Sequence, residues 1–150
     1  MKNVIVVALG GARYAIELRW VREIFTLGPI TPVPKTPPEI AGVVNFRGAI
    51  VPVLSLARLA GSGHTPTVPR ATDGAVLVEV EGVHAAIAMD NVDAVCTLED
   101  APSEPDESLL QPALLDAHGH RVRLLSPPEL IKAAAVRVSH VIQTEVPARA

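Results

Sequence analysis

The 150-residue sequence predicts an all-β fold, in which two small barrels share a hydrophobic core and short helices follow some of the strands. Hydrophobic residues make up 49% of the chain but aromatic residues only 3%, so the core must be aliphatic and rich in strand-forming valine and isoleucine. Short apolar runs are separated by two-residue turn signals, which is typical of β-hairpins. The pattern of the first half also recurs in the second, which indicates two copies of one unit.

The repeat has a constant offset of 71 residues, the distance from Val7 to Val78. At this offset residues 4–27 align with 75–98 without a gap, and Ser55 later aligns with Ser126. Two barrels of ~60 residues each would be marginally stable alone, so they should share a hydrophobic seam. We therefore expect a single domain over residues 1–150. The two repeat units should span about 4–59 and 75–130, the linker about 61–74 and the tail about 133–150.

Turn signals and prolines set the elements of the first unit. Gly10-Gly11 and Arg47-Gly48 each separate two apolar runs and predict hairpin turns. The stretch from Pro29 to Pro38 contains five prolines and can be neither a helix nor a central strand. Ser55 is a plausible N-cap of a short helix that ends at Ala60. The expected strands are Asn3–Leu9, Ala12–Leu18, Val21–Leu27, Ile40–Phe46 and Ala49–Leu54.

The second unit repeats these signals. Glu81-Gly82 predicts the turn that corresponds to Gly10-Gly11, and Ser126 followed by Pro127 predicts the start of a helix. After Ala134 the tail contains valines and an isoleucine that could form one more strand before Pro147. The expected strands and helix are Val76–Val80, Val83–Met89, Val92–Leu98 and Pro128–Ala134.

Charge and cysteine content exclude several classes of protein. The first 75 residues hold eight basic and four acidic side chains (net +4), and the last 75 hold five and twelve (net −7). Neither half is basic enough to suggest nucleic-acid binding. The single Cys96 excludes an internal disulfide and suits a reducing cytoplasm. No apolar run reaches the ~18–20 residues that a transmembrane helix needs, so we expect a soluble cytoplasmic protein.

The sequence also argues against an enzyme. It contains no nucleophile elbow, phosphate-binding glycine loop, zinc-ligand spacing or dinucleotide fingerprint. Asp90 and Asp93 lie beside a strand without a third ligand, and His118 and His120 flank a predicted turn, so structural roles are favoured for all four. We expect no catalytic residue, no metal and no cofactor. A small all-β ligand-binding barrel remains the alternative to an interaction module.

Three segments resemble the CheW family of chemotaxis adaptors, and together they cover nearly the whole chain. Tyr14–Ile24 ends in a sequence similar to that family's V-x-E-I strand, and Met89–Val95 is similar to its V-D-x-V-x-x-V segment. The most specific match is Pro34–Leu54, which resembles P-x-x-P-x-x-x-x-G-V-x-N-x-R-G-x-I-V-P-V. The main departure lies at Leu124–Leu130, where the family usually has L-L-D-x-x-x-L.

The resemblance implies a fold and a function. It implies two SH3-like five-stranded barrels around a shared core. It also implies a scaffold that binds the regulatory domain of a CheA-type histidine kinase by barrel-to-barrel contact. The cytoplasmic tip of a chemoreceptor would bind in a groove between the barrels, which would recruit the protein to membrane-associated receptor arrays.

The resemblance further implies a protein-interaction site, while the residues themselves leave alternatives open. The guanidinium of Arg47 could contact a partner or brace the adjacent proline-rich loop. Gly42 could permit close backbone approach or simply begin a strand. Trp20 could be an exposed interface residue or partly buried. By sequence alone Val21 would be a core residue, Glu23 solvated, and Asn45 and Gly48 turn residues. The expected site comprises Val21, Glu23, Gly42, Asn45, Arg47 and Gly48.

Overall fold

The structure is a computed structural model that describes residues 2–36, 40–55, 69–100, 110–115 and 121–134. Within these ranges the chain is mostly β-strand, with a 3-10 turn, η1 (Leu18–Trp20), and a helical segment at 127–134. The strands are β1 (Lys2–Leu9), β2 (Ala12–Glu17), β3 (Val21–Thr26), β4 (Ile40–Phe46), β5 (Ala49–Leu54), β6 (Gly74–Val80), β7 (Val83–Met89), β8 (Asn91–Asp100), β9 (Leu110–Leu115) and β10 (Arg121–Leu125).

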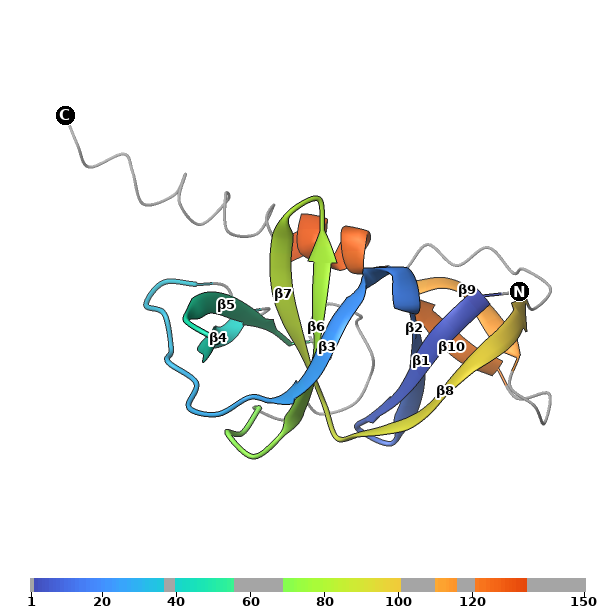
Figure 1. Cartoon of the computed structure of the whole chain (residues 1–150), viewed down its shortest axis with the longest axis horizontal. Helices are drawn as coiled ribbons and strands as arrows, with labels where there is room; N and C mark the ends of the chain where they lie inside the picture. The colour runs from blue at the N-terminus through green and yellow to red at the C-terminus, as the bar shows by residue number, and fades with distance from the viewer. Residues whose placement is uncertain (1, 37–39, 56–68, 101–109, 116–120, 135–150) are drawn as a thin grey trace.

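The strands form two five-stranded units that lie side by side (Figure 1). One is a closed barrel in the order β1-β2-β10-β9-β8, and the other is a sheet in the order β3-β6-β7-β5-β4. The predicted fold class, an all-β fold of two SH3-like five-stranded barrels that share a core, is confirmed, and among the described strands one of the two units is closed into a barrel.

Each unit combines strands from both copies of the sequence repeat. The first hairpin of one copy, β1-β2, completes the barrel with β8, β9 and β10 of the other copy. The second sheet reverses this exchange, because β6-β7 joins β3, β4 and β5. The hydrogen-bond registers keep the repeat offset: Leu124 lies opposite Ala15 in the barrel, and Val53 lies opposite Ala86 in the sheet. A repeat unit in the sequence is therefore not a barrel in space.

The hairpin turns follow from backbone geometry. Both residues of the Gly10-Gly11, Arg47-Gly48 and Glu81-Gly82 turns have positive φ, as two-residue type I′ turns require. Arg47 and Glu81 each adopt a φ of 50°, which is unfavourable for a residue with a side chain. The twist of the two flanking strands imposes this conformation.

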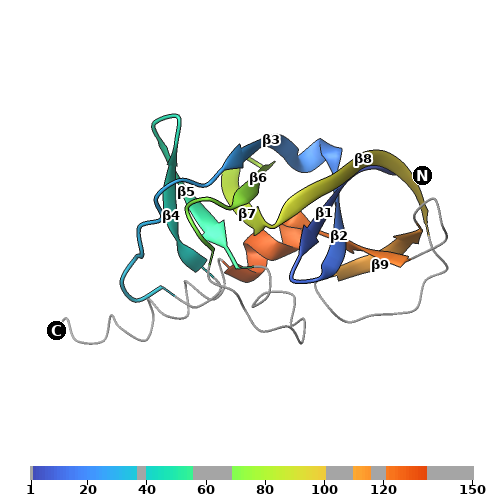
Figure 2. The same cartoon turned by 90° about the horizontal axis from the view of Figure 1, so that it is seen from below.

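The largest hydrophobic cluster lies between the two units and is their shared core. Ile5 and Ile16 come from the barrel, Val76 and Ile87 from the sheet, and Leu130 from the helical segment 127–134, and each is at most 1% exposed. Figures 1 and 2 show this segment in orange-red on one side of the shared core, with β3 and β8 on the opposite side. The helix therefore covers one side of the junction and leaves the other side uncovered by helix.

Two local predictions can be compared directly with the structure. Ser126 caps the helical segment as predicted, because its Oγ accepts a hydrogen bond from the backbone N–H of Glu129 at 3.4 Å. The strand predicted to end at Leu18 instead ends at Glu17, where the chain enters η1 and crosses to the other sheet. Several predictions lie outside the described residues: the helix after Ser55, the turn with His118 and His120, and the strand in the tail.

Candidate functional site

The five-stranded sheet has two edges, β3 and β4, and side chains join them. The rings of Phe25 on β3 and Phe46 on β4 lie 4.8 Å apart between centroids. Beside them Arg47, in the β4–β5 turn, donates a hydrogen bond from Nη2 to Oε1 of Glu23 on β3 at 2.6 Å. An aromatic contact and an ion pair thus close this seam between the two edge strands.

Arg47 is the most exposed member of the seam. Its side chain is 72% exposed and lies over the ring of Phe46, with 5.0 Å between Cζ and the ring centroid. Among the described residues Arg47 contacts Glu23 and Phe46, so its side chain joins β3 to the β4–β5 turn. The structure thus brings together two of the predicted site residues, Arg47 and Glu23.

Gly42 permits close backbone approach, which was one of its two interpretations. A Cβ at this position would lie 2.7 Å from both Cγ2 of Ile30 and the carbonyl oxygen of Thr31. The glycine lets the proline-rich loop pair with β4, where Thr31 and Val43 exchange two backbone hydrogen bonds of 2.9 Å. Gly42 is buried, so its direct role is to position this loop.

The remaining predicted site residues have structural contacts. Oδ1 of Asn45 accepts a hydrogen bond from the N–H of Gly48 at 2.9 Å and so fixes the hairpin turn that carries Arg47. Val21 is half-buried against the shared core, opposite Val78 of β6. Both observations agree with what the residue types alone suggested.

Sequence reasoning missed an exposed apolar border of the shared core. Ile24 on β3 lies opposite the buried Val76, and Val95 on β8 lies opposite the buried Ile5, so both side chains are on core-facing sides of their strands. They are nevertheless 45% and 61% exposed, and Leu18 in η1 is 37% exposed. Ile24 and Val95 are repeat equivalents at the 71-residue offset, a correspondence that could have drawn attention to them as a pair.

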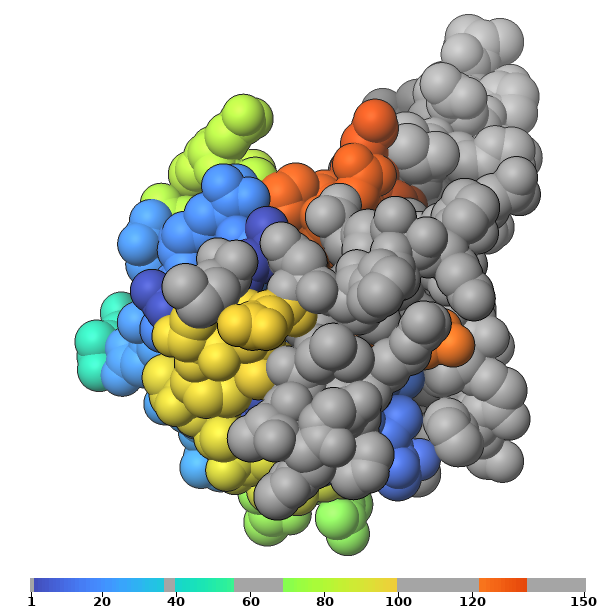
Figure 3. Space-filling model, turned by 90° about the vertical axis from the view of Figure 1, so that its right-hand side faces the viewer, coloured from blue at the N-terminus to red at the C-terminus, as the bar shows by residue number. Residues whose placement is uncertain are grey.

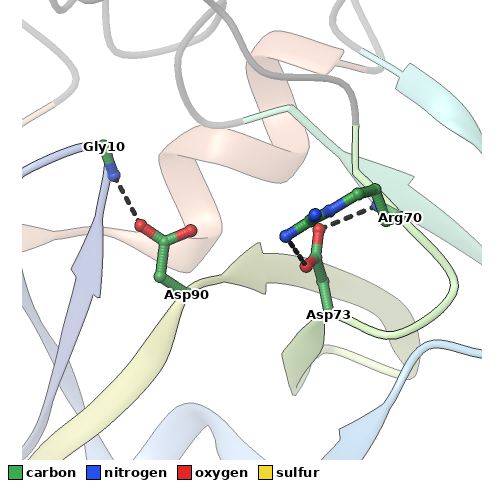
Figure 4. Close-up of polar contacts among 4 residues, drawn as sticks. All are labelled: Gly10, Arg70, Asp73 and Asp90. Carbon is green, nitrogen blue, oxygen red and sulfur yellow. Dashed lines mark hydrogen bonds and ion pairs between the residues drawn. The ribbon is translucent and has the colours of Figure 1, made fainter.

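Asp90, Asp93 and Trp20, which the sequence raised as candidates for other roles, make local contacts in the structure. Asp90 accepts a hydrogen bond from the N–H of Gly10 at 3.0 Å, which ties the first hairpin to the connection between β7 and β8 (Figure 4). Asp93 pairs with Arg13 at 2.8 Å. Trp20 is half-buried, and the guanidinium of Arg19 lies over its ring at 4.6 Å.

Charged side chains also meet on the sheet. Glu79 of β6 accepts a hydrogen bond from Nε of Arg22 at 2.5 Å, and this bond holds the pKa of the Glu79 carboxyl below its usual value. Among the described residues no group of three or more His, Cys, Asp or Glu side chains could hold a metal ion. Within the same ranges, no helix is both long and apolar enough to cross a membrane.

Comparisons with known proteins agree with this geometry. The family model for the CheW-like domain matches residues 3–135. The chemotaxis protein CheW of Rhizobium meliloti is 29% identical over 105 residues, which cover 69% of this chain and 66% of that protein. The FrzA protein of Myxococcus xanthus is 37% identical over 62 residues, which cover 41% of this chain and 39% of that protein. The matched region thus spans slightly less than two thirds of the rhizobial relative.

The fold also has a solved counterpart. The scaffolding protein TtCheW of Thermoanaerobacter tengcongensis superposes with a TM-score of 0.69 at 24% identity, over 83% of this chain and 88% of that chain. At this identity the likeness concerns the fold alone. Because the family model covers nearly the whole chain, including both edges of the seam and both sides of the shared core, the chain belongs to the CheW-like domain family.

Proposed function

We propose that this protein is a non-enzymatic adaptor that couples chemoreceptors to a CheA-type histidine kinase in a chemosensory array. The observation that carries the proposal is the exposed apolar border formed by Leu18, Ile24 and Val95 at the junction of the two units. Large exposed apolar patches mark protein-interaction surfaces, and we propose that these three side chains, on η1, β3 and β8, belong to one. Membership of the CheW-like family supports the same function.

The border suits a receptor tip. The strands β3 and β8, which carry Ile24 and Val95, lie on the side of the shared core opposite the helical segment 127–134, and the family's receptor groove between the barrels would lie there. An apolar surface between two rigid sheets can receive the apolar face of a helical hairpin. The protein would act in the cytoplasm and be recruited to membrane-associated arrays through this contact.

The seam suits a second contact, with the regulatory domain of the kinase. Arg47 donates a hydrogen bond to Glu23, and its guanidinium, with five N–H donors, can also bind a partner carboxylate or carbonyl. Gly42, Asn45 and Gly48 position this arginine and the loop beside it, while Val21 supports β3 from the core side. We therefore propose that the six residues act as one site, with Arg47 and Glu23 in contact with the partner.

The alternative of a small ligand-binding barrel has less support. The core of the sheet unit consists of buried aliphatic side chains such as Val44, Val53 and Leu77. The core of the barrel contains Val4, Val6 and Leu124. A carrier of this size would instead need an internal cavity to enclose its ligand.

Substitutions at the border test the receptor contact. We expect Ile24→Ser and Val95→Ser each to weaken binding of a soluble receptor cytoplasmic fragment about tenfold, because covering an exposed aliphatic side chain contributes ~1.5 kcal/mol. Val83→Ser is the matched control, since Val83 is 50% exposed but lies beside the β6–β7 turn. Binding would be measured by isothermal titration calorimetry. If all three variants bind as the wild type does, the border is not the receptor site.

The non-enzymatic part of the proposal has its own test. Phosphoryl transfer needs positioned acids that hold metal ions and a loop that binds phosphate, and the sequence offers neither motif. Purified protein should therefore not hydrolyse ATP above a buffer blank. Hydrolysis that a single substitution in this chain abolishes would refute the assignment.

A further inference from the structure

A hollow of about 390 Å³ opens at the start of β1, lined by Lys2, Asn3, Glu17, Leu18 and Arg19. Three elements meet there: β1, the end of β2, and η1. In Figure 3 the dark blue start of β1 lies next to the yellow β8. Leu18 belongs both to the hollow and to the apolar border, so the hollow adjoins the proposed receptor site.

The sequence repeat shows how the two units differ beside the hollow. At the 71-residue offset Asn3 corresponds to Gly74 and Leu18 to Met89. In the sheet, Met89 is buried and lies over Gly74, with its Cε 3.4 Å from where a Cβ of that glycine would be. In the barrel, β2 ends one residue before Leu18, and that side chain remains 37% exposed. Leu18 is therefore not buried in the barrel as Met89 is in the sheet, and the hollow lies beside it.

The lining carries an excess of positive charge. Glu17, whose side chain is only 15% exposed, pairs with Nζ of Lys2 at 3.4 Å and with Nε of Arg19 at 2.7 Å. Two cations thus share one carboxylate. Oδ1 of Asn3 accepts a hydrogen bond from Thr97, so its amide nitrogen is the atom with which Asn3 can donate to a ligand.

This charge is particular to the barrel. In the sheet, the positions that correspond to Lys2, Glu17 and Arg19 hold no lysine or arginine. They are Asp73, Ala88 and Asp90. The two units therefore differ at this place in both shape and charge. A partner that binds at the junction could therefore distinguish the barrel from the sheet at this place.

We propose that the hollow binds a segment of the receptor in which an acidic side chain stands next to an apolar one. The apolar side chain would cover the exposed Leu18, and the carboxylate would meet Lys2 and Arg19. Such charge-assisted contacts at the rim of an apolar site fix the orientation of a bound partner. The inference rests on the proposed adaptor function and adds the chemistry of the partner segment.

The first test is a charge reversal in the full chain. Arg19→Glu should weaken binding of the receptor cytoplasmic fragment at least tenfold, while Arg70→Glu should change it less than twofold. Arg70 is the matched control, because it is also an exposed arginine with an acidic partner, Asp73, in a turn before β6 (Figure 4). Circular dichroism spectra would confirm that both variants are folded. Equal binding by wild type and Arg19→Glu would overturn the inference and leave the adaptor function standing.

The second test does not depend on the receptor. Trp20 is the only tryptophan, and Arg19 links it to the hollow, so its fluorescence reports on occupation. The blocked peptide acetyl-Leu-Glu-Leu-amide should give a saturable change, and acetyl-Leu-Lys-Leu-amide should not. Equal responses to the two peptides, or no response to the acidic one, would overturn the inference. If the receptor fragment fails to bind the wild-type protein, the proposed adaptor function is refuted. The two peptides then test by themselves whether the hollow binds an acidic and apolar segment.

Discussion

Removing the side chain of Arg47 should reduce binding far more than it reduces stability. The side chain is 72% exposed, and its two contacts are the ion pair with Glu23 at 2.6 Å and the ring of Phe46 at 5.0 Å. An exposed ion pair contributes ~0.2–1 kcal/mol and an exposed cation–π contact ~0.5–1 kcal/mol. Arg47→Ala should therefore lower the free energy of unfolding by about 1 kcal/mol, which in a chain of this length lowers the Tm by about 2–4 °C.

The effect on binding should be larger if the seam meets the kinase. An arginine at the centre of an interface contributes ~2 kcal/mol or more, which corresponds to a loss of affinity of about 30-fold. Urea denaturation followed by circular dichroism would give the stability, and calorimetry with the kinase regulatory domain would give the affinity. The variant Glu23→Ala and the double variant would complete a double-mutant cycle, in which the unfolding free energies should show a coupling of about 0.5 kcal/mol.

The backbone of Arg47 supplies a control. Arg47→Gly removes the same contacts as Arg47→Ala, but it also relieves the unfavourable φ of 50°. The glycine variant should therefore be more stable than the alanine variant by about 1 kcal/mol and should bind equally weakly. A loss of stability of ~3 kcal/mol or more with alanine, zero coupling to Glu23, or unchanged affinity for the kinase would each refute part of this reasoning.

Three further predictions concern the fold. Gly42→Ala should destabilise the protein by about 2–3 kcal/mol in urea denaturation, because its Cβ would meet the Thr31 carbonyl at 2.7 Å. Gly28→Ala, at a φ of 70° with nothing within 4 Å, should cost only about 1 kcal/mol, so equal effects would contradict the close-approach argument. Leu130→Ala should cost about 2–5 kcal/mol, because this side chain is fully buried in the shared core; a cost below ~1 kcal/mol would show that the helical segment is dispensable. Fragments 1–62 and 63–150 should each fail to fold, because each holds only part of both units; a well-dispersed proton NMR spectrum from either fragment would disprove this.

The sequence by itself determined the local structure and the composition of the core. The hairpins at Gly10-Gly11 and Arg47-Gly48 follow from turn chemistry between apolar runs, and the cap at Ser126 follows from residue type, so both predictions hold. These features depend on residues close together in the chain, where the energetics are set by a few neighbours. The six site residues came from family resemblance, and the sequence alone indicated only turn, core or solvated positions for most of them.

Tertiary structure decided which strands share a sheet and which apolar residues stay exposed. Because the two repeat units are alike, the hairpins β1-β2 and β6-β7 present similar edges, and hydrophobic pattern alone cannot say whether each is completed by its own unit or by the other. The chain resolves this at η1, which crosses between the units directly after β2. Ile24 and Val95 have core-like sequence patterns but remain exposed; they belong to β3 and β8, which lie on the side of the junction opposite the helical segment. Long-range packing, which no local pattern encodes, therefore made the candidate binding surface.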